Sequence, residues 1–254
     1  MERKVEIVYV YKVDHDLGQN PNPFGDYCTL AYCKGGMRDA IQKYVAKQQF
    51  KNPDLSVRDM GIWVIGIAGA RLGKERREKL LYAMQVTEVL TFEEYWADSR
   101  FEYKTRVLSE RESSEIINGH KNNYAFWRNN KNRLVCGDNI RDEEDSGHGH
   151  LLVSDNFIYH GTECGTQDEI FMKFNSNDPV RGHRVFSNDK KVAKKAMPDK
   201  IISYIQNEFK NKKCLARPTF SAEGFDYACK EDFVIHRKKD RRENNSLPKR
   251  VRHC

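Results

Sequence analysis

The sequence lacks any apolar run long enough to cross a lipid bilayer, which takes about 20 consecutive, mostly apolar residues. Its first ten residues, MERKVEIVYV, also lack the charged, apolar and small-residue layout of a secretory signal peptide. Charged side chains make up 32% of the 254 residues. These features predict a soluble, cytoplasmic protein without a membrane partner.

Cysteine residues follow no regular spacing. The chain has seven of them, an odd number, and it is large enough to fold without cross-links, so we expect reduced thiols. His148, His150, His160 and Cys164 are of the types that bind zinc. No matching cysteine or carboxylate spacing accompanies them, and we expect no metal site.

The recurrent catalytic and cofactor motifs are missing as well. The sequence has no P-loop, no dinucleotide-binding fingerprint, no GxSxG nucleophile elbow and no zincin helix. We therefore expect no cofactor, and no motif assigns a reaction class.

Two apolar runs form the longest strand-like stretch of the chain. Ile62–Ala68 and residues 80–90 are rich in Val, Ile, Trp, Tyr and Thr, which favour strands, and residues 69–79 between them are rich in glycine and charge. This pattern predicts a β-hairpin with a long cationic connection. Thr91, followed three residues later by Glu94, predicts a capping box at the start of a short helix.

The rest of the chain alternates between strand-like and helix-like patterns, which predicts an α+β fold. Charges and amides dominate the polar link at residues 47–59 and the long segment at residues 98–131, for which we expect loops. The further expected strands are residues 5–13, 28–33, 151–154, 157–160 and 231–236, and the expected helices are residues 37–46 and 199–210.

Several segments carry side chains suited to ligand contact. Residues 14–27 combine amides and prolines with Phe24, which suits either a ligand-binding loop or a tight connection in which Phe24 fills the core. Lys34 and Arg38 flank two glycines at the start of an expected helix, where free backbone N–H groups can hold an anion.

Two further side chains have both a structural and a functional interpretation. Trp63 is either a core residue or a ring on which a base stacks. Arg184, in the segment RGHR at residues 181–184, is suited either to phosphate binding or to a salt-bridged surface loop.

Basic side chains concentrate in two places. The net charge is +7, from 44 basic and 37 acidic side chains, and residues 237–254 alone hold eight basic against two acidic ones. Such clusters attract phosphate backbones without reading sequence, although ordinary solvation explains them equally well. The expected backbone contacts are Arg71, Lys74, Arg76, Arg77, Lys238, Lys239, Arg241 and Arg242.

An ordered set of sequence blocks resembles the second family of nucleotide-modification-associated domains, found in bacteria and phages. The blocks are NPNPF, CTLAYCKGGMR, GIWVIGIAG, LLYAMQVTEVLTFEEYW, RFEYK, CGDNI, LLVSDNFIYHG and RGHR, over roughly residues 5–210. The resemblance implies such a domain at residues 1–213, a basic extension at residues 214–254, and a role in systems that modify DNA bases or defend against foreign DNA. The order of elements is also similar to PUA-like domains, which implies a mixed β barrel with flanking helices.

These observations together predict a protein that binds nucleic acid, with DNA favoured, or a modified nucleotide. The alternative is an enzyme of nucleotide or base modification in which Asp14, Cys33, Lys104 or Asp138 acts. The expected ligand-binding residues are Asp14, Asn22, Phe24, Thr29, Cys33, Lys34, Arg38, Trp63, Lys104, Asp138, Asn139 and Arg184.

Overall fold

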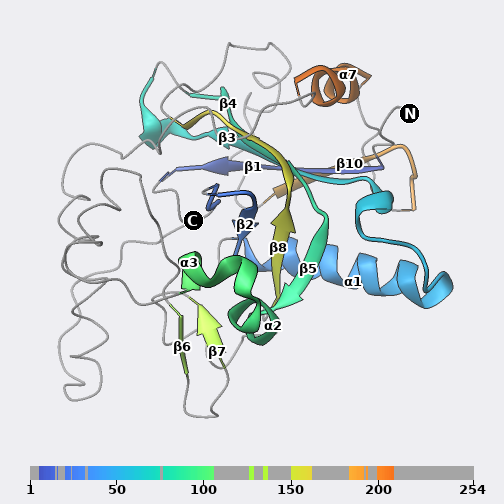
Figure 1. The fold of residues 1–254 in the computed structure, drawn as a ribbon. Coiled ribbons are helices and arrows are strands. Elements are labelled where there is room, and N and C mark those ends of the chain that lie inside the picture. The colour runs from blue at the N-terminus through green and yellow to red at the C-terminus, as the bar shows by residue number, and fades with distance from the viewer. Residues whose placement is uncertain are drawn as a thin grey trace, which may run out of the picture.

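The computed structural model has the mixed α+β architecture that the sequence predicts, with two main sheets and a few helices (Figure 1). It describes residues 6–14, 16, 21–23, 25–31, 34–74, 77–105, 126–128, 134–136, 150–161, 183–191, 193 and 199–208.

The larger sheet has five strands in the order β10-β1-β3-β4-β9. The central pair, β1 and β3, is parallel, and every other neighbouring pair is antiparallel. The expected hairpin is therefore confirmed as β3 and β4. The strand bounds are β1 Ile7–Val13, β3 Ile62–Ala68, β4 Leu80–Gln85, β9 Asn156–Tyr159 and β10 His183–Ser187.

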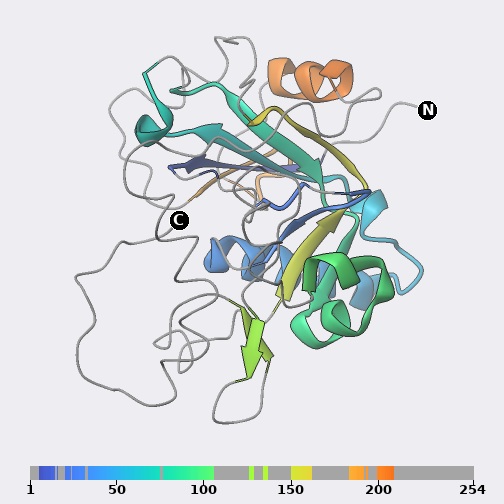
Figure 2. The same cartoon turned by 60° about the vertical axis from the view of Figure 1, so that its left-hand side comes forward.

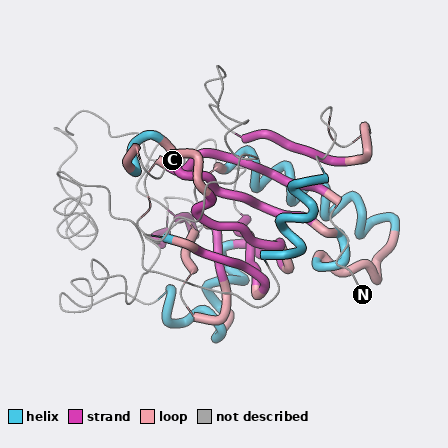
Figure 3. Tube along the Cα trace, turned by 90° about the horizontal axis from the view of Figure 1, so that it is seen from above, coloured by secondary structure: helices cyan, strands magenta, loops and turns pink. Residues whose placement is uncertain are grey.

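Both faces of this sheet are buried. Helix α1 (Gly35–Lys51) packs against one face through Met37, Ile41 and Val45. Helix α7 (Asp199–Glu208) packs against the opposite face, where Ile201 and Ile205 join the core (Figures 2 and 3). Burial on both sides explains why β3 is a continuous apolar run rather than an alternating one.

A single bent ribbon links the larger sheet to the smaller one. β4 leads into β5 (Glu88–Thr91), and β8 (His150–Ser154) leads into β9. The antiparallel register is the same on both sides of the bend, because Gln85 faces Asn156 before it and Glu88 faces Val153 after it. The smaller sheet, in the order β2-β8-β5, is completed by β2 (Cys28–Leu30).

The predicted PUA-like barrel is not confirmed. In the described ranges the strands form two sheets that share the bent ribbon, together with a separate two-stranded pair, and they do not close into a barrel. The remaining elements are η1 (Arg58–Met60), η2 (Ala70–Leu72), α2 (Phe92–Ala97), η3 (Ser99–Phe101), α3 (Glu102–Thr105), β6 (Phe126–Arg128) and β7 (Leu134–Cys136).

The structure confirms one local expectation and changes the bounds of two predicted elements. Thr91 and Glu94 form the predicted capping box. Helix α1 extends beyond the predicted residues 37–46 at both ends, and its last turns take up part of the expected polar link because Lys and Gln are good helix formers. Residues 80–90, expected as one strand, divide at the bend into β4 and β5. Residues 214–254 lie outside the described residues.

Among the residues that the structure describes, no helix combines the length and apolar content needed to cross a bilayer.

We predict that Gly66→Ala destabilises the protein. A Cβ atom at Gly66 would lie 2.1 and 2.4 Å from two ring atoms of Tyr82 and 3.0 Å from Val13 Cγ2. Overpacking of a close-packed core costs about 1–3 kcal/mol, which urea unfolding would measure.

Gly36→Ala is the matched control for Gly66→Ala. A Cβ atom at Gly36 meets nothing within 4 Å, and this helical position gains up to about 1 kcal/mol from alanine. Equal free energies of unfolding for the two variants would contradict the packing of Tyr82 against β3.

Candidate functional site

A row of paired residues crosses all five strands of the larger sheet. From β10 to β9, His183 pairs with Tyr11, Tyr11 with Gly66, Gly66 with Tyr82, and Tyr82 with Tyr159. Residues paired in register point to the same face, and these lie on the face covered by α1. We call Tyr11, Tyr82 and Tyr159 the tyrosine row; each is at most 1% exposed.

Gly66 provides the space that the row needs in its centre. Because glycine has no Cβ, the Tyr82 ring lies directly against β3 at this point. The hydroxyl groups of Tyr82 and Tyr11 are 2.6 Å apart, and their rings meet edge to face with centroids 6.0 Å apart. The two buried hydroxyls therefore satisfy one another by a hydrogen bond.

A buried carboxylate lies at the β9 end of the row. Tyr159 donates from its hydroxyl to Asp16 Oδ1 at 2.5 Å, and Asp16 is only 1% exposed. A carboxylate can remain in such an interior only when it is hydrogen-bonded, so Tyr159 and Asp16 depend on one another.

Cationic and imidazole groups lie near the other end. Lys34 precedes α1 in a left-handed conformation, and its Nζ is 5.3 Å from the centroid of the Tyr11 ring, a cation–π distance. The rings of His183 and Tyr9 are 5.7 Å apart. Burial, and then the positive charge of Lys34, lower the pKa of His183, so this imidazole is neutral at neutral pH.

Tyr9, whose ring lies next to that of His183, stays protonated at neutral pH. Burial and the neighbouring Tyr44 raise the pKa of Tyr9 to about 12. The region thus brings together phenolic hydroxyls, a neutral imidazole, an ammonium group and a carboxylate from separate segments of the chain. Such a set can donate hydrogen bonds to a heterocycle, accept them from it, and neutralise an anionic group.

Arg38, in the first turns of α1, is buried against the smaller sheet. It is 2% exposed and donates from Nη1 to the backbone carbonyl of His150, which connects α1 to β8. This hydrogen bond therefore holds α1 against the smaller sheet.

Lys104 forms a second buried polar cluster with two other predicted residues. It is fully buried, and its Nζ donates to the Asn22 carbonyl at 3.0 Å, to the Tyr27 carbonyl and to Thr29 Oγ1 at 3.4 Å. Burial lowers the pKa of Lys104 to about 7, while Cys28 acts in the opposite direction. This cluster orders the connection into β2 through backbone groups.

The Lys104 cluster is separate from the tyrosine row. Thr29 pairs with Val153, which packs with Tyr95 and Phe101 of the α2–α3 region, whereas Leu30 packs into the core on the α1 side. The Lys104 cluster therefore lies on the face of the smaller sheet that points away from the core containing the tyrosine row.

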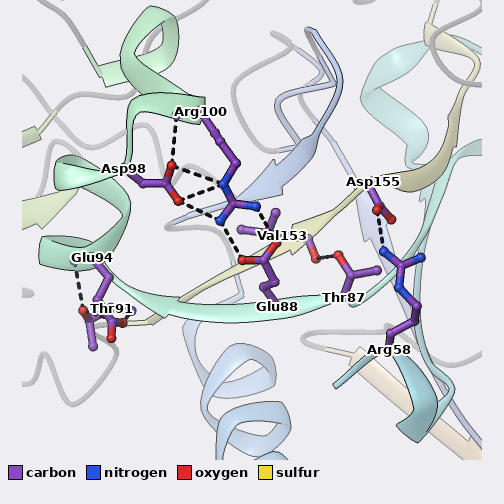
Figure 4. Close-up of polar contacts among 9 residues, drawn as sticks. All are labelled: Arg58, Thr87, Glu88, Thr91, Glu94, Asp98, Arg100, Val153 and Asp155. Carbon is purple, nitrogen blue, oxygen red and sulfur yellow. Dashed lines mark hydrogen bonds and ion pairs between the residues drawn. The ribbon is translucent and has the colours of Figure 1, made fainter. Parts of the chain in front are cut away.

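A surface network fixes the segment that carries Lys104 (Figure 4). Arg100 donates to both carboxylate oxygens of Glu88 at 2.8 Å and to Asp98 at 2.7–3.2 Å, and its guanidinium lies 5.2 Å from the Tyr27 ring. These hydrogen bonds lower the pKa of Asp98. Bidentate geometry makes this network more effective than an isolated surface ion pair, and it attaches η3 to β5.

The structure does not bring Trp63 to the row. Trp63 is 1% exposed and packs in the core on the α7 side of the sheet. Arg184 pairs with Val10 and so faces the same side as Trp63. Asp14 is exposed at the end of β1, next to Gly69.

Other predicted positions are exposed or fall outside the described residues. Arg71, Lys74 and Arg77 are exposed, and Arg77 Nε is 3.2 Å from a carboxylate oxygen of Glu78. In the described parts of the chain, no group of three His, Cys, Asp or Glu residues could hold a metal. Outside the described residues lie Phe24, Cys33, Arg76, Asp138, Asn139, His148, Cys164, Lys238, Lys239, Arg241 and Arg242.

One feature of the sequence could have indicated the row, a glycine in the middle of a strand. Gly66 interrupts an otherwise bulky run, which indicates a close approach of another group. Asp16 and the row tyrosines carry no motif, because the pairings that assemble them join distant parts of the chain.

We predict that Lys104 makes stability rise with pH. Its pKa is about 7 in the folded protein against 10.5 for an ordinary lysine, so the unfolded chain binds more protons between these values. The free energy of unfolding of the natural protein, relative to Lys104→Met, should therefore increase from about pH 7 to about pH 10. Urea unfolding measures this difference. Lys43→Met, on the exposed side of α1, is the control, and a Lys104 difference independent of pH would contradict the burial effect.

Comparison with known proteins gives one match. The model of the family described as nucleotide modification associated domain 2 matches residues 5–50 and 51–224. No curated protein and no solved structure matches the chain significantly. Since the family match spans most of the sequence, the chain belongs to the nucleotide modification associated domain 2 family and is associated with nucleotide modification systems.

Proposed function

We propose that the protein binds a nucleotide, or a modified base in a nucleic-acid strand, at the tyrosine row, with DNA the favoured nucleic acid. The observation that carries the proposal is the buried row of phenolic hydroxyls between Lys34 at one end and Asp16 at the other. In a family associated with nucleotide modification, this combination suits a ligand that joins an anionic group to a polar heterocycle.

Lys34 supplies the contact for phosphate. It is partly exposed, its side chain lies over the Tyr11 ring, and that side chain makes no capping hydrogen bond to α1. A phosphate would attract the ammonium group away from the ring, and this movement would uncover Tyr11 for the base. The free N–H groups of the first turn of α1 would add to the attraction.

The hydroxyls supply selectivity. Tyr11 and Tyr82 bond to one another, so a base that replaces this bond with its own exchanges one hydrogen bond for another at little net cost. A base without the matching group leaves a buried hydroxyl unsatisfied. Sites built in this way reject the wrong ligand much more strongly than apolar pockets do.

Cations elsewhere would strengthen binding to longer nucleic acids. Arg71, Lys74 and Arg77 are exposed on the connection between β3 and β4. Contacts from these groups to backbone phosphates would make affinity fall as salt rises.

Calorimetric titration of the full chain tests the proposal. The ligands are nucleoside 5′-monophosphates, the matching nucleosides, and plain and modified oligonucleotides over a salt series. We expect Lys34→Gln to weaken binding of the monophosphates about tenfold and of the nucleosides little, because a charge-assisted contact contributes about 1.5–3 kcal/mol.

Lys190→Gln, an exposed lysine beyond β10, is the control for Lys34→Gln and should leave the affinities unchanged. Failure to bind any of these ligands, or affinities that depend neither on the base nor on salt, would contradict the proposal.

An enzyme of nucleotide or base modification is the second candidate. It is favoured by the buried pair of Asp16 and Tyr159, since a carboxylate 2.5 Å from a phenolic oxygen can pass a proton. Mass spectrometry of nucleotides incubated with the natural protein and with Asp16→Asn would distinguish the two candidates. Enzymatic conversion requires a product that only the natural protein forms.

A further inference from the structure

The outer side of α1 carries a line of basic side chains. Lys43, Lys47 and Lys51 follow one another at four-residue spacing and are all exposed. Their exposure places them outside the face formed by Met37, Ile41 and Val45, which enter the core. The three lysines are therefore on the solvent side of α1, the blue helix of Figure 1.

An aromatic ring interrupts this basic line. Phe50 is 90% exposed, and it sits three residues after Lys47 and directly before Lys51. A favourable interaction with the helix dipole explains a lysine in the last turn of α1, but it does not explain an exposed phenyl group. We call Lys43, Lys47, Phe50 and Lys51 the α1 stripe.

The lysines of the stripe make no polar side-chain contact within the described structure. None of the three forms an ion pair or a side-chain hydrogen bond with any residue that the structure describes. The acidic residues nearest in sequence are Asp39, one turn before Lys43, and Asp54, after the helix ends. The stripe is therefore a net positive surface with an aromatic ring in it.

We infer that the α1 stripe is a contact surface for a single strand of nucleic acid. Neighbouring lysines are about 6 Å apart along the helix axis and the line spans about 12 Å, so the stripe reaches two or three backbone phosphates. Phe50 stacks on one base. The inference rests on the proposed function in taking nucleic acid as the partner, but it uses a surface separate from the tyrosine row.

Two physical arguments favour a single strand over other polyanions. Stacking on Phe50 needs a base whose face is open, and neighbouring base pairs cover these faces in a duplex. A membrane-surface helix would show several large apolar side chains on its outer side, whereas the stripe has one, beside Gln42 and Gln49.

Fluorescence anisotropy with a labelled single-stranded oligothymidylate of about 12 nucleotides tests the inference. In the full chain, Lys43→Gln combined with Lys47→Gln should weaken binding and lower the slope of log affinity against log salt by about 1.4, since each lost phosphate contact on a single strand removes about 0.7. Phe50→Ala should weaken binding about tenfold and leave the salt slope unchanged.

Lys190→Gln combined with Lys191→Gln is the matched control, because it removes the same charge from two other exposed lysines. The inference is overturned if the control reproduces the loss, or if the α1 variants bind the oligonucleotide like the natural protein. It is also overturned if duplex DNA binds as tightly and is insensitive to Phe50→Ala, or if phosphatidylserine vesicles alone show the dependence on the stripe.

Titration of the same variants with nucleoside monophosphates separates this inference from the proposed function. We expect the α1 variants to keep the mononucleotide affinity of the natural protein, and Lys34→Gln to lose it. Oligonucleotide binding that depends on the stripe, without any mononucleotide binding, would support the stripe and reject the row as the nucleotide site.

Discussion

The unbroken register of the bent ribbon is the constraint on which the rest of the structure depends. It places Tyr82 opposite Tyr159 in the larger sheet and Thr91 opposite His150 in the smaller one. A slip of one residue would turn every side chain of one strand to the other face. Such a slip would remove Tyr82 from Tyr11 and expose the apolar side of the ribbon, so the same pairing that closes the core also assembles the candidate site.

Burial of polar groups in this core lowers the stability of the fold unless each group finds a hydrogen-bond partner. Phenylalanine at Tyr11, Tyr82 and Tyr159 would supply nearly the same ring without a hydroxyl that needs a partner. The interior instead holds a hydroxyl pair and a carboxylate that depends on Tyr159. Because these groups are arranged in one row, next to a cation, we attribute them to ligand recognition rather than to stability.

Features encoded by neighbouring residues could be predicted from the sequence, whereas features that depend on pairing between distant strands could not. Strand β3, helix α1 and the Thr91 capping box follow from composition, periodicity and a four-residue motif, and all three were predicted. The division between β4 and β5 was not, because no glycine or proline marks the bend at residues 86–87. The predicted barrel assumed closure, which depends on pairings between distant strands that no local pattern encodes.

The placement of the predicted site residues also depends on pairings between distant parts of the chain. Trp63 and Lys34 are both expected ligand-binding residues, but the sequence does not reveal which face of β3 each helix covers, and Trp63 lies on the α7 side. Lys104 and Thr29 were both expected to bind ligand and are together, yet Lys104 bonds mainly to backbone carbonyls. Asp16 was missed because its role depends on Tyr159, which is 143 residues away.

A crystal structure of the chain with a bound nucleoside monophosphate is the most direct test of the tyrosine row as the ligand site. Our account predicts electron density for the phosphate at Lys34 and for the base against Tyr11 and Tyr82, with the Lys34 side chain withdrawn from the Tyr11 ring. A nucleotide bound instead on the α7 side near Trp63, or at the Lys104 cluster, would contradict it.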